Sequence, residues 1–350
     1  MSNIEKELQN DGIFVTEKID TNLVLKITKN ISKKICNTFP NFGLDEEKIF
    51  SKLFSLNMYK AKIPEGTLEA SYCYKNCSIY FNDSISNEDL EEFAIHECIH
   101  YLQEVKNSHN KILKMGLSIY LPFKTVGIGL NEAAVQYISA RIIGIKPDFE
   151  KYYDLNIFTP SPSYYPIECA LLNELIFFLG EDLIFKSTFF STNDFRRELI
   201  KRTSKSTFNK IIKAFDDILK YEEQIIKLKN TKSKQEIEFI RNSIKTSFIE
   251  TQNLIIEDFF DNDFSKIKNL EELENFRRNL SKVKKYLATT SNYTFFDDYY
   301  LEMMNKLEHK SNILENGGIE TALEKKHFSI FDLIQKLKKL LLHQNNTEND

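Results

Sequence analysis

Residues 87–103 read NEDLEEFAIHECIHYLQ, and within them His96, Glu97 and His100 form the pattern His-Glu-x-x-His. Two histidines four positions apart on a helix lie on one face, one turn from each other. This spacing lets both imidazoles reach one zinc ion, and the glutamate between them can take a proton from a water bound to that ion. The stretch therefore predicts a metal-binding helix with Glu97 as the general base.

The residues around the pattern favour a helix. Its apolar residues recur at helical spacing and are Leu90, Phe93, Ala94, Ile95, Ile99 and Leu102. We expect the helix to start near Asn87, with Asn87 or Ser86 as its N-cap. The pattern alone would arise by chance in roughly one such chain in a hundred. The alternative is a helix whose histidines are ordinary surface or core residues, and the mid-helix position of the pattern argues against it.

A third metal ligand is expected downstream, because catalytic zinc usually has three protein ligands and one open position. His109 lies in a polar turn without glycine, and we expect it to be a solvated loop residue. Glu132 is a better candidate, since it follows two glycines in the first turn of a small-residue helix for which Asn131 is a suitable cap. An acidic residue there also suits the positive end of a helix. Position alone therefore does not decide whether Glu132 is a metal ligand or only stabilises the start of the helix.

The sequence resembles a known family at this point. HExxH followed downstream by Asn-Glu-Ala-Ala at residues 131–134 looks like the gluzincin branch of zinc metallopeptidases. The resemblance implies that zinc is bound by His96, His100 and Glu132, with Glu97 as the general base. It covers roughly residues 60–195 and is closer to uncharacterised bacterial gluzincin-like proteins, which carry a tyrosine-rich segment after the second helix.

Further site residues follow from this resemblance. Asn131 and Gln136 fit positions from which they would orient the metal ligands. A tyrosine often supplies a hydrogen bond to the oxyanion that develops during hydrolysis. Tyr165 is the first candidate for that role, with Tyr164 and Tyr137 as alternatives.

Residues 66–82 predict a β-hairpin, because β-branched and aromatic residues alternate around a Lys-Asn turn at residues 75–76. In zincins, a strand at the sheet edge just before the active-site helix pairs with the extended substrate. A strand edge of that kind would provide main-chain hydrogen bonds to a peptide. Cys73 and Cys77 lie in the same segment and are weak zinc candidates, since no second cysteine pair has their spacing.

The chain of 350 residues exceeds the usual size of one hydrophobic core, so two domains are expected. We expect a mixed α+β fold in which residues 1–205, with a core at 60–195, form a zincin-like catalytic domain with a small antiparallel sheet and an active-site helix. Apolar stripes at helical spacing in residues 237–255 and 270–287, and near 324–343, predict a mostly α-helical bundle at 206–343. The polar tail at 344–350 is expected to be disordered.

Composition excludes several function classes. The net charge of −4 is spread over both signs, and no basic face of the kind that nucleic acid requires is evident. The longest apolar stretch, near residues 176–178, is far too short to cross a bilayer, and the charged N-terminus has no apolar signal segment. The five cysteines, an odd number, fit a reducing compartment. We expect a cytoplasmic protein without a nucleic-acid or membrane partner.

These observations predict a zinc metallopeptidase that acts on a peptide or protein substrate. One alternative is a catalytically degenerate zincin-like protein that binds or regulates a protein partner through its C-terminal helical region. Another is a hydrolase of a non-peptide amide, which the sequence does not distinguish from a peptidase. The presence of Glu97 favours an enzyme, because a purely structural zinc site does not need that base.

Overall fold

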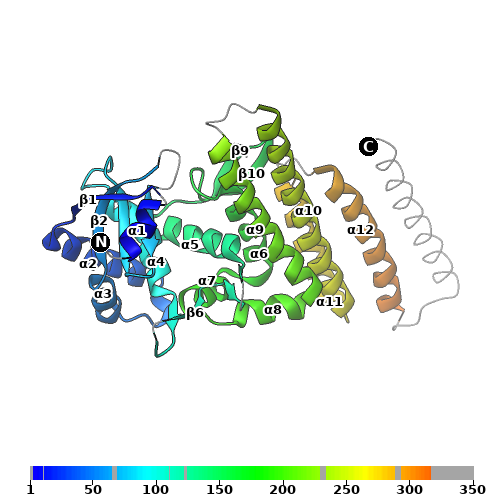
Figure 1. Cartoon of the computed structure of the whole chain (residues 1–350). Coiled ribbons are helices and arrows are strands. Elements are labelled where there is room, and N and C mark those ends of the chain that lie inside the picture. The colour runs from blue at the N-terminus through cyan, green and yellow to red at the C-terminus, as the bar shows by residue number, and fades with distance from the viewer. Residues whose placement is uncertain are drawn as a thin grey trace. The chain divides into compact units, whose positions relative to one another are not determined.

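The computed structural model describes residues 3–10, 12–64, 69–109, 111–121, 124–228, 234–287 and 293–316. The chain divides into two compact units, one within residues 1–256 and the other within 257–350. Both contain helices, and the described strands all belong to the first unit, which makes the protein mixed α+β as expected (Figure 1). The predicted last helix near 324–343 and the predicted tail at 344–350 lie outside the described residues.

The main sheet of the first unit has four strands. In spatial order they are β1 (Phe14–Lys18), β2 (Asn57–Lys62), β4 (Ser78–Asn82) and β3 (Ala70–Cys73). The predicted hairpin is confirmed for its described part, since β3 and β4 pair antiparallel. The sheet is not purely antiparallel, however, because β2 and β4 run parallel. That pairing joins strands that are not consecutive, and the local alternation of side chains carries no information about it.

Each face of the sheet is covered by helices. α1 (Asn3–Asn10) packs on one face, where Leu8 contacts Ala61 and Tyr80. Because side chains alternate along a strand, Ile79 and Phe81 point to the opposite face, and both are fully buried. Three helices pack together with the sheet in this region and are α2 (Thr21–Thr38), α3 (Glu46–Phe54) and α4 (Leu90–Leu102). A short 3-10 turn, η1 (Pro40–Phe42), joins α2 to α3.

The helix that carries HExxH, α4, begins at Leu90 and therefore later than expected. Residues 87–89 form turns instead of helix, and the Asp89 amide donates to the Ser86 hydroxyl at 3.3 Å. Ser86 thus closes a local turn ahead of the helix, and Asn87 is not the N-cap. Side chains of Ser and Asn compete in this way with helical hydrogen bonds at a helix start.

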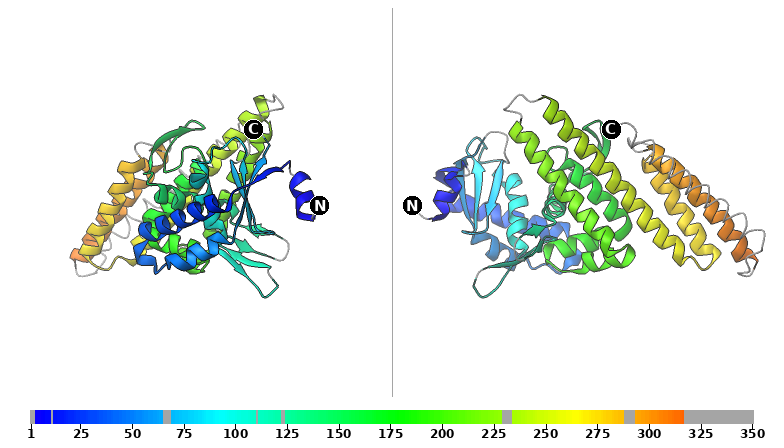
Figure 2. Two further views of the ribbon diagram at one scale, coloured as in Figure 1. Left: turned by 90° about the vertical axis from the view of Figure 1, so that its left-hand side faces the viewer. Right: turned by 45° about the vertical axis from the view of Figure 1, so that its right-hand side comes forward.

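The other helices of the first unit follow the HExxH helix in the sequence. They are α5 (Ile128–Ile143), α6 (Pro166–Leu179), α7 (Glu181–Phe189), α8 (Asp194–Arg202), α9 (Lys205–Leu228) and most of α10 (Lys234–Lys266). α5, α6 and α9 pack against one another (Figure 2). Three two-stranded sheets lie in the connections. They pair β5 (Glu104–Lys106) with β6 (Ile112–Met115), β7 (Ile119–Tyr120) with β8 (Thr125–Val126), and β9 (Asp148–Tyr152) with β10 (Leu155–Thr159).

The units divide at Ile256–Glu257, whereas the predicted boundary lies between residues 205 and 206. α9 belongs to the first unit because the Asp216 carboxylate accepts hydrogen bonds from the amides of Gly127 and Gly129, at 2.8 and 3.0 Å. A helical stripe in the sequence indicates that a helix is buried on one face and does not say which core buries it.

The second unit contains the last turns of α10 together with α11 (Leu270–Leu287) and α12 (Tyr293–Glu315). The stripe predicted for α11 is confirmed, and its buried residues are Leu273, Phe276, Leu280, Val283 and Leu287. Phe276 packs edge-on against Phe260, with ring centroids 5.4 Å apart. Among the described residues, every helix is either too short or too polar to cross a membrane.

Candidate metal centre

α4 and α5 bring together the three side chains proposed as metal ligands. His96 and His100 share one face of α4, and their Nε2 atoms lie 3.0 Å apart. Oε2 of Glu132, from α5, lies 3.2 Å from each of these nitrogens. The three donor atoms therefore form a nearly equilateral triangle. It is the one group of three or more His, Cys, Asp or Glu side chains within the described segments that is close enough to hold a metal ion.

The size of this triangle suits a small divalent cation. In a tetrahedral zinc site with bonds of 2.0–2.1 Å, donor atoms lie about 3.3 Å from one another. Two imidazole nitrogens and one carboxylate oxygen suit zinc and neighbouring transition metals better than calcium or magnesium, which prefer oxygen donors. The residues present thus fit a tetrahedral ion with three protein ligands and a fourth position open.

The charges of the site also favour a cation. Burial lowers the pKa of His100, but the nearby Glu132 carboxylate outweighs burial and raises this pKa to about 9. Burial raises the pKa of Glu132, but the two imidazoles outweigh it and hold this pKa well below its ordinary value. Glu132 is therefore an anion at neutral pH, and without metal it keeps a proton on His100. A bound metal ion would replace that proton.

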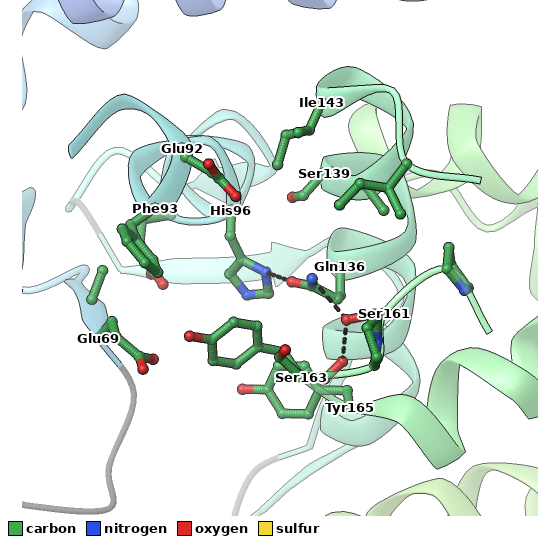
Figure 3. A pocket seen from close by; sticks show the side chains of 17 residues that line it. Glu69, Glu92, Phe93, His96, Gln136, Ser139, Ile143, Ser161, Ser163 and Tyr165 are labelled. Carbon is green, nitrogen blue, oxygen red and sulfur yellow. Dashed lines mark hydrogen bonds between the residues drawn. The ribbon is translucent and has the colours of Figure 1, made fainter. Parts of the chain in front are cut away.

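Gln136 orients His96 from behind. The Nδ1 atom of His96 lies 2.9 Å from Oε1 of Gln136, so Nδ1 is the protonated nitrogen and Nε2 presents its lone pair to the triangle. Nε2 of Gln136 donates to the Ser161 hydroxyl at 3.0 Å, and that hydroxyl donates to the Tyr164 carbonyl at 2.6 Å. Figure 3 shows this chain of hydrogen bonds running from His96 to Ser161. The predicted contact of Gln136 with the ligands is thus present.

Asn131 lies at a different place in its helix, and makes different contacts, from those expected. α5 starts at Ile128, so Asn131 lies inside the helix and does not cap it. Its Oδ1 accepts from the Leu117 amide at 2.9 Å, and its Nδ2 donates to Oε1 of Gln103 at 3.3 Å. Gln103 in turn lies beside His100 and contributes to its raised pKa. Asn131 therefore acts one contact further from the ligands than the sequence suggested.

The start of α5 is capped from a distant part of the chain. Gly127 precedes the helix in a left-handed conformation, with φ of 79°. The Asp216 carboxylate of α9 receives the free amides that a local N-cap would otherwise bind. Glu132 consequently lies in the second turn of α5, at a position set by α9, and not in the first turn as predicted.

Glu97 and Tyr165 both lie beside the donor triangle. Glu97 lines both of the cavities that adjoin the donor triangle, and so does Tyr165. The ring of Tyr165 stacks beside the ring of His96, with centroids 6.0 Å apart. Burial, with the carboxylates of Glu132 and Glu97 nearby, raises the pKa of the Tyr165 hydroxyl well above its usual value. The hydroxyl therefore stays protonated and can donate a hydrogen bond.

The other sequence candidates lie elsewhere. The Tyr137 hydroxyl donates to Asn173 at 2.9 Å, while Tyr164 lines one cavity near Glu69. His109 lies in a turn in which its backbone amide donates a hydrogen bond to Oδ1 of Asn107 at 2.9 Å, as expected for a loop residue. Cys73 and Cys77 carry free thiols and do not belong to the group that could hold a metal ion.

Two cavities flank the donor triangle. The first is lined by α4, α5 and residues 160–165, and the second by β3, β6 and the start of α5. Both reach His96, Glu97 and Tyr165, so the triangle lies at the junction of two hollows.

Three residues that support the site were not predicted from the sequence. Gln103 follows His100 by three positions, so helical spacing could have identified it. Ser161 and Asp216 reach the site only through tertiary packing, and no local signal marks them. Comparison with protein-family models, curated proteins and solved structures finds no match to this chain.

Proposed function

We propose that this chain is a zinc-dependent peptidase with a zincin-like active site. The observation that supports it is the donor triangle of His96, His100 and Glu132 with Glu97 beside it, at the junction of two cavities. A structural zinc site is usually closed by four protein ligands, whereas a catalytic site keeps one position open. Three ligands and an adjacent carboxylate correspond to the second type.

In the proposed reaction, zinc would be held by His96, His100 and Glu132, and would act as a Lewis acid on the carbonyl group and on water. Glu97 takes a proton from the attacking water and passes it to the leaving nitrogen. The Tyr165 hydroxyl donates a hydrogen bond toward the oxyanion that develops on the carbonyl oxygen. Gln136 holds the His96 ring in the required tautomer.

The edge of the sheet offers a binding surface for a peptide. β3 is one of the two edge strands of the sheet, and it packs next to α4. Residues of β3 line both cavities, Ala70 the first and Ser71 and Tyr72 the second. A peptide that adds to this edge would gain main-chain hydrogen bonds and would cross the donor triangle.

Metal analysis and cleavage assays on variants test this proposal. The purified wild-type protein, supplied with zinc, should hold close to one equivalent and cleave a mixed peptide library, as measured by mass spectrometry. His96→Ala should lose the metal, and Glu97→Gln should keep it while cleavage falls by at least about 100-fold, the lower end of what acid–base catalysis contributes. His109→Ala and Glu88→Gln are matched controls outside the site. A zinc content unchanged in His96→Ala, or full cleavage by Glu97→Gln, would refute the proposal.

A further inference from the structure

Ser161 is a buried residue that contacts two parts of the proposed active site. Its hydroxyl accepts a hydrogen bond from Nε2 of Gln136 at 3.0 Å and donates one to the Tyr164 carbonyl at 2.6 Å. Figure 3 shows Ser161 beside Gln136, with a dashed line to each of its two partners. Only 3% of Ser161 is exposed, and loss of a buried hydroxyl leaves its partners unpaired.

The segment that carries Ser161 is stiff. Pro160 and Pro162 flank this residue, directly after β10 ends at Thr159. Each proline ring fixes its own φ at about −65°, and it also restricts the residue before it to extended conformations. The Ser161 amide in addition donates to Oγ1 of Thr159 at 3.2 Å. The hydroxyl of Ser161 is therefore held in one place by its own segment.

Through Gln136, Ser161 acts on a proposed zinc ligand. Oε1 of Gln136 lies 2.9 Å from Nδ1 of His96, and Nε2 of Gln136 is the atom bound to Ser161. The terminal amide of a glutamine rotates easily about its last bond, and a partner for each of its two polar atoms fixes its plane. Ser161 therefore keeps the Gln136 oxygen turned toward the His96 ring.

The second hydrogen bond of Ser161 acts on the backbone of Tyr165. This tyrosine has φ of 52° and ψ of 43°, a left-handed conformation that residues with a Cβ atom rarely adopt. Strained residues of this kind persist only where their surroundings hold them. The Tyr164 carbonyl belongs to the peptide group that rotates when φ of Tyr165 changes. Because Ser161 holds this carbonyl, it opposes relaxation of Tyr165 to an ordinary backbone conformation.

We propose that Ser161 is a positioning residue that couples the orientation of His96 to the placement of the Tyr165 hydroxyl. This inference rests on the proposed peptidase function, in which His96 holds the ion and Tyr165 contacts the oxyanion. His96 belongs to α4 and Tyr165 precedes α6, so a shared contact is needed to keep their separation fixed. A fixed separation matters, because a displacement of about 1 Å can lower a rate by about 100-fold.

Zinc affinity tests the half of the proposal that concerns His96. Ser161→Ala, Gln136→Leu and the double variant would be compared with wild type by competition with a chelating dye. Ser161→Ala should weaken zinc binding by about 10-fold, the lower end of the range for groups that support metal ligands. The double variant should match Gln136→Leu within about two-fold, the uncertainty of such comparisons. Unchanged affinity in Ser161→Ala, or a double variant that shows both losses in full, overturns the proposal.

Cleavage rates test the half that concerns Tyr165. At saturating zinc, Ser161→Ala should lower kcat by about 10- to 100-fold with little change in KM, since the Tyr165 hydroxyl is present but displaced. Ser161→Ala combined with Tyr165→Phe should be no slower than Tyr165→Phe alone, within about two-fold. A kcat unchanged in Ser161→Ala, or a further loss in the double variant, contradicts the coupling.

Ser32→Ala is the matched control. Ser32 is fully buried, and its hydroxyl donates to the Thr28 carbonyl at 2.6 Å, within α2 and outside both cavities. This variant should keep the zinc affinity and the kcat of wild type. Losses equal to those of Ser161→Ala would show that removal of any buried serine hydroxyl disturbs the site, and the proposal would fall.

A spectroscopic measurement separates this inference from the proposed function. The tyrosine rings would be isotope-labelled for NMR, and the Tyr165 signal would be identified by its loss in Tyr165→Phe. In the zinc-loaded protein this signal should move or broaden in Ser161→Ala and stay in place in Ser32→Ala. A moved signal and a lowered zinc affinity, with no peptide cleaved by the wild-type protein, would refute the peptidase function and support the positioning role. A Tyr165 signal in Ser161→Ala identical to that of wild type would refute the positioning role.

Discussion

Gly129 occupies a position where α5 and α9 touch, and its replacement by alanine tests how the third ligand is held. A Cβ atom built on Gly129 would lie 2.3 Å from the Phe215 carbonyl oxygen and 2.6 Å from its carbonyl carbon. Both are backbone atoms of α9, so neither can rotate away. Ordinary van der Waals contact begins near 3.4 Å, so the two helices would have to separate by about 1 Å.

The sign of the effect on stability distinguishes packing from helix propensity. Gly129 has an ordinary helical backbone, and alanine in place of glycine there would by itself stabilise the helix by about 1 kcal/mol. Overpacking against a fixed backbone costs about 1–3 kcal/mol, and separation of the helices also stretches the two hydrogen bonds that the Gly127 and Gly129 amides donate to Asp216. We expect a net loss of roughly 1–2 kcal/mol, which corresponds to about 2–8 °C in Tm.

The shift should also reach the metal centre, because Glu132 follows Gly129 by three residues on the same helix. Zinc affinity, measured by competition with a chelating dye, should fall by about 10- to 100-fold, as when groups that support metal ligands are disturbed. Gly144→Ala at the other end of α5 is the control: its φ of +91° makes alanine strained there, but open space surrounds it. That variant should lose stability and keep its zinc affinity. A Gly129→Ala protein with a higher Tm and unchanged zinc affinity would refute the reasoning.

Three other predictions concern single side chains. Gln136→Leu should weaken zinc binding by about 10- to 100-fold, measured by the same dye competition, because it removes the acceptor of the His96 ring proton; unchanged affinity would show that Gln136 does not position His96. Tyr165→Phe should lower kcat by about 100-fold with little change in zinc content, since it removes one donor to the oxyanion; an unaltered rate would exclude that role. Burial, opposed by a hydrogen bond from Gln252, raises the pKa of the Glu174 carboxyl from 4.5 to about 8, so its contribution to stability is present below pH 4.5 and lost as the pH rises to 8. Urea unfolding of Glu174→Gln should therefore show a smaller loss of stability over this range, on the order of a few kcal/mol, and identical pH profiles for both proteins would contradict the assignment.

The local part of the site followed from sequence because it depends on helix geometry. A spacing of four residues places His96 and His100 on one face of any helix, wherever that helix packs. The same reasoning predicted the buried stripe on α11. The first residues of the helices were harder to predict from the sequence. A local turn precedes α4, and the distant Asp216 carboxylate binds the first amides of α5.

The distant part of the site required the fold. On position alone, Glu132 was as well explained by the charge at a helix start as by metal binding, and the structure brings it within 3.2 Å of both imidazoles because α5 packs beside α4. Asp216 of α9 caps α5 and so sets where Glu132 lies, and this contact also places α9 in the first unit. Repeat spacing along a chain encodes which residues share a helix face. Which faces then meet depends on side-chain volume and on hydrogen bonds between remote segments, and one-dimensional spacing does not record those.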